Sequence, residues 1–218
     1  MIFSQETARQ VALHLLEVKA IQLSPEKPFT WASGLRSPIY CDNRVSLSYP
    51  KVRNYIRQQL YRAATTFFQE TDIVVGVATA GIPQGALVAE ELDLPFAYVR
   101  AGKKDHGMTN QIEGHVKSGQ KALVVEDLVS TGKSSLLAVE ALREAGVEVL
   151  GMVSVFTYGL EIAQTNFEEA RCRLVSLSDY DHLIEAAVKQ EYVSKDALAS
   201  LKQWRKDPQL WSEQNSDQ

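Results

Sequence analysis

The sequence predicts an α/β fold with a central, mostly parallel β-sheet flanked by helices. Strands that are apolar on both faces are typical of a parallel sheet covered on both sides. Segments with helical spacing separate the apolar runs, as expected when parallel strands are joined by helices. The chain has 218 residues, enough for one such domain with a small appendage. The apolar, β-branched runs are residues 73–78, 96–100, 121–125 and 148–156.

Before the sheet, the sequence predicts two amphipathic helices joined by turns. Residues 6–18 and 49–68 carry apolar side chains at helical spacing. Between them, residues 24–44 are polar and contain Gly34 and several prolines, so this stretch is expected to form turns.

Two further helices are expected within the sheet region, over residues 82–92 and 133–145. Residues 174–177 are expected to add an edge strand. Residues 180–211 read as a helical, charged tail, and residues 212–218 as a polar, frayed end.

Composition excludes several classes of function. The net charge is −4 and no run of five basic residues occurs, which argues against a nucleic-acid-binding protein. Cys41 and Cys172 are far apart and form no CxxC motif, so we expect reduced thiols and a cytoplasmic protein. No apolar N-terminal signal and no stretch of 18 apolar residues is present, so no membrane association is expected.

Ligands of such sheets bind at the carboxyl ends of the strands, so the loops that follow residues 78, 100, 125 and 156 should converge. The loop after residue 125 is the most informative. Two adjacent carboxylates, Glu126 and Asp127, follow a buried strand, and a loop with small and hydroxyl-bearing residues leads into a helix. The helix N-terminus and the hydroxyls could bind a phosphate monoester. The two acids would repel that phosphate, but they could accept hydrogen bonds from sugar hydroxyls or approach Mg²⁺.

The alternative for this segment is a helix capped by Ser130 or Thr131, which leaves the two acids unexplained. A P-loop is excluded, because Asp127 stands where that motif requires glycine.

A second feature is the loop of residues 101–114, which is long, polar and flanked by glycines. With the preceding Arg100 it concentrates Lys103, Lys104 and His106, a composition suited to a lid over a diphosphate. The alternative is a solvated charged hairpin.

The run from Leu123 to Ser135 resembles the phosphoribosyl-diphosphate (PRPP) motif of the type I phosphoribosyltransferases. The resemblance implies that fold with a small N-terminal hood, and Mg²⁺ bound mainly through the substrate with Asp127 as a candidate protein ligand. It implies that Glu126 and Asp127 act in catalysis and hold the ribose hydroxyls. The loop that binds the 5-phosphate would comprise Leu128, Val129, Ser130, Thr131, Gly132, Lys133 and Ser134.

The lid sequence, Arg-x-x-x-Lys-x-His-Gly followed by Asn-Gln-Ile-Glu-Gly, resembles orotate phosphoribosyltransferases in particular. The resemblance implies a homodimer in which lid loop 101–114 reaches the neighbouring subunit's site. It further implies that Arg100, Lys104 and His106 bind PRPP and that Lys104 is catalytic.

Two more segments match this family. Thr79, Ala80 and Gly81 correspond to its pyrophosphate loop, which often contains an unusual peptide bond; the alternative is a tight βα turn. The segment 29–44 resembles the hood over the base, with Tyr40, Arg44 and Ser130 as candidate orotate ligands.

Phe29, Trp31 and Tyr40 could form the apolar wall of the hood, or could be ordinary core. Other members carry lysine where this chain has Ala32, Ala80 and Ala101.

The expected division of the chain is a helix and hood segment at 1–48, a transferase core at 49–180 and a helical tail at 181–218. The implied reaction joins orotate to PRPP, with release of diphosphate. Two alternatives remain, a transferase for another base and a PRPP-sensing regulator.

Overall fold

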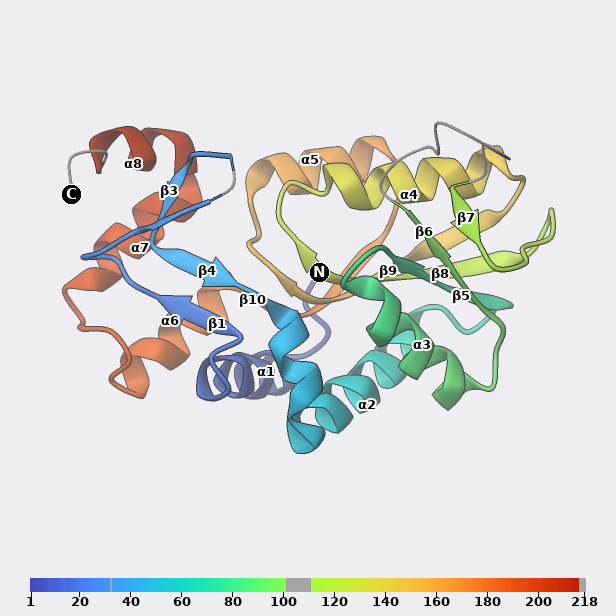
Figure 1. Cartoon of the computed structure of the whole chain (residues 1–218), viewed down its shortest axis with the longest axis horizontal. Coiled ribbons are helices and arrows are strands. Elements are labelled where there is room, and N and C mark those ends of the chain that lie inside the picture. The colour runs from blue at the N-terminus through green and yellow to red at the C-terminus, as the bar shows by residue number, and fades with distance from the viewer. Residues whose placement is uncertain (32, 101–110, 216–218) are drawn as a thin grey trace.

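The computed structural model describes residues 1–31, 33–100 and 111–215. A six-stranded sheet lies at its centre, in the order β10-β9-β8-β5-β6-β7 (Figure 1). Neighbouring strands are parallel except β6 and β7, so the predicted fold class is confirmed. The strands are β5 (Ile73–Val77), β6 (Phe96–Val99), β7 (Ile112–Glu113), β8 (Lys121–Val129), β9 (Glu148–Thr157) and β10 (Leu174–Asp179).

Helices cover both faces of this sheet, which explains why its strands are apolar on both sides. On one face lie α1 (Gln5–Glu17), α2 (Pro50–Phe67) and α3 (Gly81–Leu92), and on the other α4 (Lys133–Glu144) and α5 (Glu161–Glu169) (Figure 1). Side chains such as those of Val74 and Leu123 are fully buried between these layers. Across the described residues, no helix combines the length and the apolar character that crossing a membrane requires.

The hood is made of four short strands that lie outside the main sheet. They are β1 (Ile21–Leu23), β2 (Phe29–Thr30), β3 (Arg36–Ser37) and β4 (Ile39–Cys41), and a 3₁₀ helix, η1 (Asn43–Ser48), follows them. Strand β1 pairs with β4 and β2 with β3, both antiparallel. The C-terminal helices are α6 (Tyr180–Lys189), α7 (Ala197–Lys206) and α8 (Pro208–Gln214). Figure 1 shows α7 and α8 beside the hood strands, at the end of the molecule away from β6 and β7.

Four elements differ from the predictions. The stretch predicted as turns, residues 24–44, contains the hood strands β2, β3 and β4, which are too short to show an alternating pattern. Helix α5 was not predicted, because Ala163 and Phe167 are its only buried residues. Strand β7 lies within the segment predicted as a loop. The predicted frayed end is wrong for Ser212, which lies in α8 and is only 9% exposed.

Candidate active site

The acidic pair, Glu126 and Asp127, lies inside strand β8 rather than after its end. The predicted strand end at Val125 is therefore wrong. Pairing with β9 continues to the register Val129↔Thr157, because Leu128 and Val129 restore the apolar pattern after the acids. Glu126 is 5% exposed, whereas Asp127 is only partly buried.

Hydrogen bonds hold the Glu126 carboxylate in a fixed position. Ser135 Oγ donates to Glu126 Oε2 at 2.8 Å, and the backbone N–H of Asp127 donates to Oε1 at 3.0 Å. Burial, with the adjacent charge of Asp127, raises the pKa of Glu126 to about 8. Burial also raises the pKa of Asp127. A ligand that brings hydroxyl donors or a cation to this pair would stabilise its ionised form.

The phosphate loop, residues 130–134, presents a helix N-terminus next to the acids. Helix α4 begins after Gly132, so neither Ser130 nor Thr131 is its N-cap and the capping alternative is wrong in that respect. Gly132 has φ +77°, and a Cβ atom there would lie 2.5 Å from Phe167 Cε2. Glycine is therefore required both by the backbone conformation and by the contact. The first-turn N–H groups of α4 make this loop suitable for an anion.

Helix α5 supports this loop from the outside. Asn166 Nδ2 donates to Thr131 O at 2.9 Å, and the ring of Phe167 packs against Gly132. Sequence reasoning missed both residues, since the short helix that carries them shows only a weak apolar pattern. Thr131, Lys133 and Ser134 themselves are exposed.

The loop after β5 converges on the same place. The Ala78–Thr79 peptide bond is cis. A Cβ atom on Gly81 would lie 2.5 Å from Val125 O and 3.4 Å from Glu126 Oε1, so Gly81 allows α3 to start directly against the acidic strand. Ala80 is the N-cap of α3 and makes no capping hydrogen bond. A second helix N-terminus thus borders the acidic pair.

Arg100, which precedes the predicted lid segment, lies directly after β6. Arg100 Nε is 3.1 Å from Glu113 Oε1, and Arg100 N donates to Gln111 O at 2.9 Å. Ala78 N donates to Val99 O at 2.8 Å, and this bond joins the end of β6 to the loop after β5. The predicted lid residues Lys103, Lys104 and His106 lie outside the described residues.

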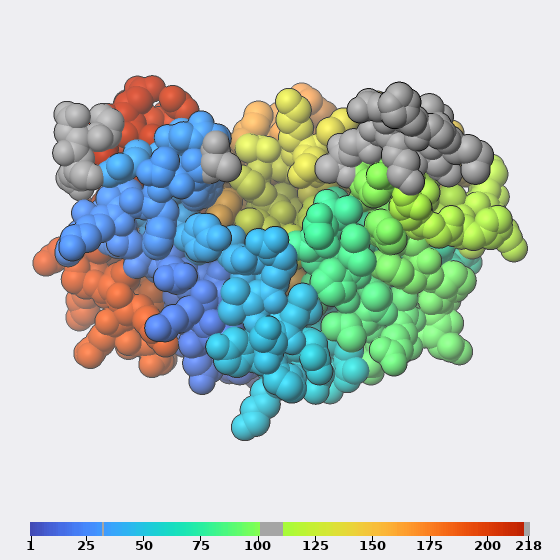
Figure 2. All heavy atoms as spheres, in the orientation of Figure 1, coloured from blue at the N-terminus to red at the C-terminus, as the bar shows by residue number. Residues whose placement is uncertain are grey.

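A residue that sequence reasoning missed joins the hood to the acidic strand. Asn43 is 1% exposed, and its Nδ2 donates to Asp127 O at 2.8 Å. In the sequence, the signal for Asn43 was its place between Asp42 and Arg44, within the predicted hood segment 29–44. In Figure 2 the hood, in blue, and the yellow surface of β8 and α4 lie on either side of a notch in the outline of this face.

The candidate base ligands of the hood occupy different environments. Arg44 is exposed and donates to both carboxylate oxygens of Asp42, at 2.7 and 2.9 Å. This pairing raises the pKa of Arg44, to which the charge of Asp127 also contributes. Tyr40 is 43% exposed, and its ring centroid lies 5.7 Å from that of Phe29. Trp31 instead packs on buried aromatic rings, so the core alternative holds for Trp31.

The described residues contain no group of three His, Cys, Asp or Glu side chains that could hold a metal ion by themselves. The adjacent carboxylates of Glu126 and Asp127 fit a cation only if a ligand supplies most of the coordinating oxygens. Because Glu126 is already held by Ser135, Asp127 is the more available of the two.

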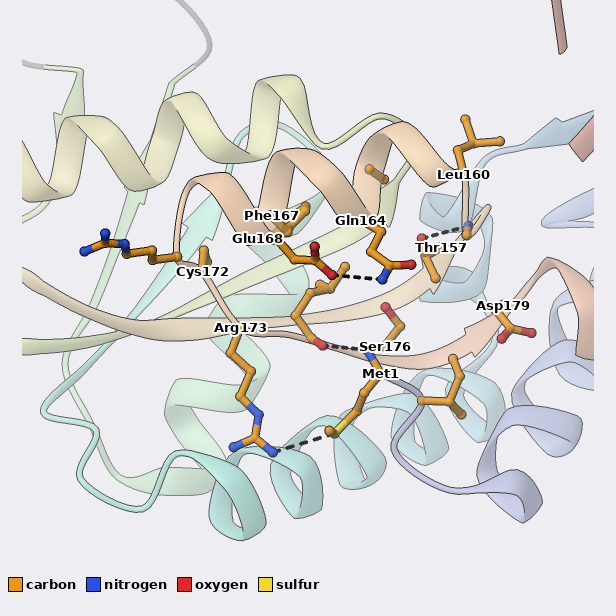
Figure 3. Close-up of a pocket in the computed structure, with 15 residues that line it drawn as sticks. Met1, Thr157, Leu160, Gln164, Phe167, Glu168, Cys172, Arg173, Ser176 and Asp179 are labelled. Carbon is orange, nitrogen blue, oxygen red and sulfur yellow. Dashed lines mark hydrogen bonds between the residues drawn. The ribbon is translucent and has the colours of Figure 1, made fainter. Parts of the chain in front are cut away.

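A separate cavity of about 780 Å³ lies between α5, β10 and the N-terminus (Figure 3). Its walls include Leu160, Phe167 and Leu174, and Arg173 lies beside Met1 at its lower end in this view. It contains none of the predicted site residues, so we place the candidate site at the acidic pair.

Comparison with known proteins agrees with this geometry. Residues 48–183 match the model of the phosphoribosyl transferase domain. An orotate phosphoribosyltransferase of Listeria innocua is 54% identical over 203 residues, covering 93% of this chain and 97% of that protein. One from Cytophaga hutchinsonii is 55% identical with the same coverage. The chain belongs to the orotate phosphoribosyltransferase family.

A solved orotate phosphoribosyltransferase, from Aeropyrum pernix, is similar in fold to this family member. Its TM-score is 0.73 at 29% identity, with 84% of this chain and 99% of that chain covered. The family predicted from the PRPP motif and the lid sequence is therefore confirmed.

Proposed function

We propose that this chain transfers the 5-phosphoribosyl group of PRPP to N1 of orotate, forming orotidine 5′-monophosphate and diphosphate in the synthesis of UMP. The observation that carries the proposal is the acidic pair in β8, bordered by the N-termini of α3 and α4. Close relatives named orotate phosphoribosyltransferase support the choice of base.

In this proposal, Glu126 and Asp127 accept hydrogen bonds from the two ribose hydroxyls. The hydroxyl donors replace water, which Glu126 has largely lost and Asp127 has lost in part. The phosphate loop, residues 130–134, binds the 5-phosphate through first-turn N–H groups and side-chain hydroxyls. Thr79, Ala80 and Gly81 bind the diphosphate through the backbone, since Ala80 offers no charge.

Bond breaking at ribose C1 builds positive charge on the sugar and negative charge on the leaving diphosphate. The carboxylates near the ribose stabilise the positive charge on the sugar. Arg100, Lys104 and His106 are proposed to neutralise the negative charge on the diphosphate. Mg²⁺, held mainly by substrate oxygens with Asp127 as the candidate protein ligand, would supply further positive charge when bound.

We assign orotate to the hood side of the site. Tyr40 offers an exposed ring, Arg44 a cation for the carboxylate and Ser130 a hydroxyl. We further propose a cytoplasmic homodimer, in which lid loop 101–114 completes the partner's site. The two free cysteines agree with a reducing compartment.

The direct test is to mix the protein with orotate, PRPP and Mg²⁺ and to follow orotate by its absorbance. Orotate should be consumed, whereas uracil, adenine and hypoxanthine should not. Preferential consumption of another base would favour the first alternative, and PRPP binding without turnover of any base would favour a regulator.

The shared site is tested by mixing two inactive variants, Lys104→Ala and Asp127→Asn. After subunit exchange about a quarter of wild-type activity should return, because half of the dimers are mixed and each has one intact site. If no activity returns in dimers that have demonstrably exchanged, the lid does not act in trans.

A further inference from the structure

The C-terminal helices contact the hood directly. Arg36 N, in β3, donates to Ser212 Oγ of α8 at 2.9 Å, although the two residues are 176 positions apart. Ser212 and its neighbour Trp211 are both buried. The hood hairpin β2–β3 pairs over only two residues, so this bond adds to the few contacts that fix it.

An aromatic cluster makes the second contact between hood and tail. The ring of Trp31, in the hood, stacks on Tyr158 with centroids 5.8 Å apart and meets Trp204 of α7 edge-on, also at 5.8 Å. Trp204 and Tyr158 meet edge-on at 5.4 Å. Trp204 is fully buried, and its Nε1 has no hydrogen-bond partner among the described residues. Its contribution is therefore ring packing rather than a polar contact.

This cluster joins the tail to both sides of the candidate site. Tyr158 follows β9, and its backbone N–H donates to Val129 O at 3.1 Å, at the end of the acidic strand. Trp31 Nε1 donates to Ile39 O at 3.0 Å, directly before Tyr40. Trp204 thus packs on Trp31, whose indole is bonded to β4 of the hood, and on Tyr158, whose backbone is bonded to the end of β8.

We propose that Trp204 and Ser212 are positioning residues, which hold the hood in place and so determine the affinity for the base without touching it. The inference rests on the proposed function, in which Tyr40 and Arg44 bind orotate. The phosphate loop is supported by Asn166 and α5 rather than by α7 or α8. The end of β8 is also held by its pairing with β9, so orotate affinity should depend on the tail much more than PRPP affinity does.

The test measures KM for both substrates and kcat in Ser212→Ala, Trp204→Phe and Trp204→Leu. Loss of one hydrogen bond or of ring packing should raise KM for orotate about three- to tenfold. Values of kcat and of KM for PRPP should stay within about twofold of wild type. Trp204→Phe should recover part of the loss that Trp204→Leu causes.

Matched controls exist within the tail itself. Ser200→Ala removes the hydrogen bond from Trp211 Nε1, at 3.0 Å, and Trp211→Phe trims a buried tryptophan. Neither side chain forms a hydrogen bond or a ring contact with the described hood residues, so both variants should lower the melting temperature without raising KM for orotate.

Equal rises in both KM values, an unchanged KM for orotate, or an equal rise in the controls would overturn the inference. If Trp204→Leu does not fold, the KM values of Ser212→Ala and Trp204→Phe are sufficient to test the inference. Failure of the proposed function would be visible separately, because wild-type protein would then not consume orotate.

Discussion

The acidic pair and the hood border one site but are held in place by different means. Glu126 and Asp127 are part of β8, whose backbone pairs with β5 up to Val125 and with β9 up to Val129. The hood strands pair over two or three residues and rely on side chains of α7 and α8. The acids should therefore be about as rigid as the sheet, whereas single substitutions can displace the hood.

This difference suggests that the sheet side serves catalysis and the hood side serves recognition of the nucleobase. In the proposed reaction, positive charge develops on the ribose, which would be bound by groups that the sheet already holds in place. The nucleobase would be bound by the hood, whose position depends on contacts with α7 and α8. Substitutions on the sheet side should change turnover, and those on the hood side should change recognition of the base.

The largest effect is expected on the sheet side. Asp127→Asn should lower kcat by about two to three orders of magnitude, as when an electrostatic contact made in the transition state is lost. The melting temperature should not fall, since burial already raises the pKa of Asp127 and disfavours its charge. Steady-state kinetics and thermal unfolding check this, and a wild-type rate would remove Asp127 from the mechanism.

Gly132→Ala tests whether the phosphate loop depends on close packing with α5. It should destabilise the fold by about 2–4 kcal/mol, from positive φ together with overpacking on Phe167, and raise KM for PRPP. The matched control is Gly119→Ala, with φ +82° but no atom within 4 Å of the added Cβ. Chemical denaturation should show a clearly smaller loss for the control. Equal losses would mean that the contact with Phe167 is unimportant.

Two asparagines, Asn43 and Asn166, test the difference between the hood side and the sheet side. Asn43→Ala removes the bond from the hood to Asp127 O, and Asn166→Ala removes the bond from α5 to Thr131 O. Each should change one KM about three- to tenfold, the usual range for a single hydrogen bond. Asn43→Ala should raise KM mainly for orotate and Asn166→Ala mainly for PRPP. The reverse pattern would contradict the division between the two sides.

A further prediction concerns the pH dependence of stability without ligand. Burial raises the pKa of Glu126 from 4.5 to about 8, so the folded state binds a proton that the unfolded state has released. The stabilising contribution of this carboxyl is thus full below its unfolded pKa and is lost as pH rises toward 8. Glu126→Gln should therefore raise the melting temperature more at about pH 9 than at about pH 5. A difference that is constant with pH would contradict a buried, protonated Glu126.

The sequence predicts the sheet side well because its signals are local. Apolar runs mark β5, β6, β8 and β9, and the acids, hydroxyls and Gly132 follow one another within a few residues. The strand boundary at Val125 was wrong because two charges interrupt an apolar pattern that Leu128 resumes.

The hood side could not be predicted in the same way. Its strands are too short to show a period, and its support comes from residues far along the chain, as the bond between Arg36 and Ser212 illustrates. The local hint was Trp204 and Trp211 in a charged tail, where large apolar rings need a partner to bury them.

The most direct test of the whole account is a crystal structure with PRPP and Mg²⁺ bound. The carboxylates of Glu126 and Asp127 should lie about 2.5–3.0 Å from the two ribose hydroxyls. The 5-phosphate should lie on the N–H groups of residues 131–134. A ribose bound away from both carboxylates would contradict the account, whatever the activity of the protein.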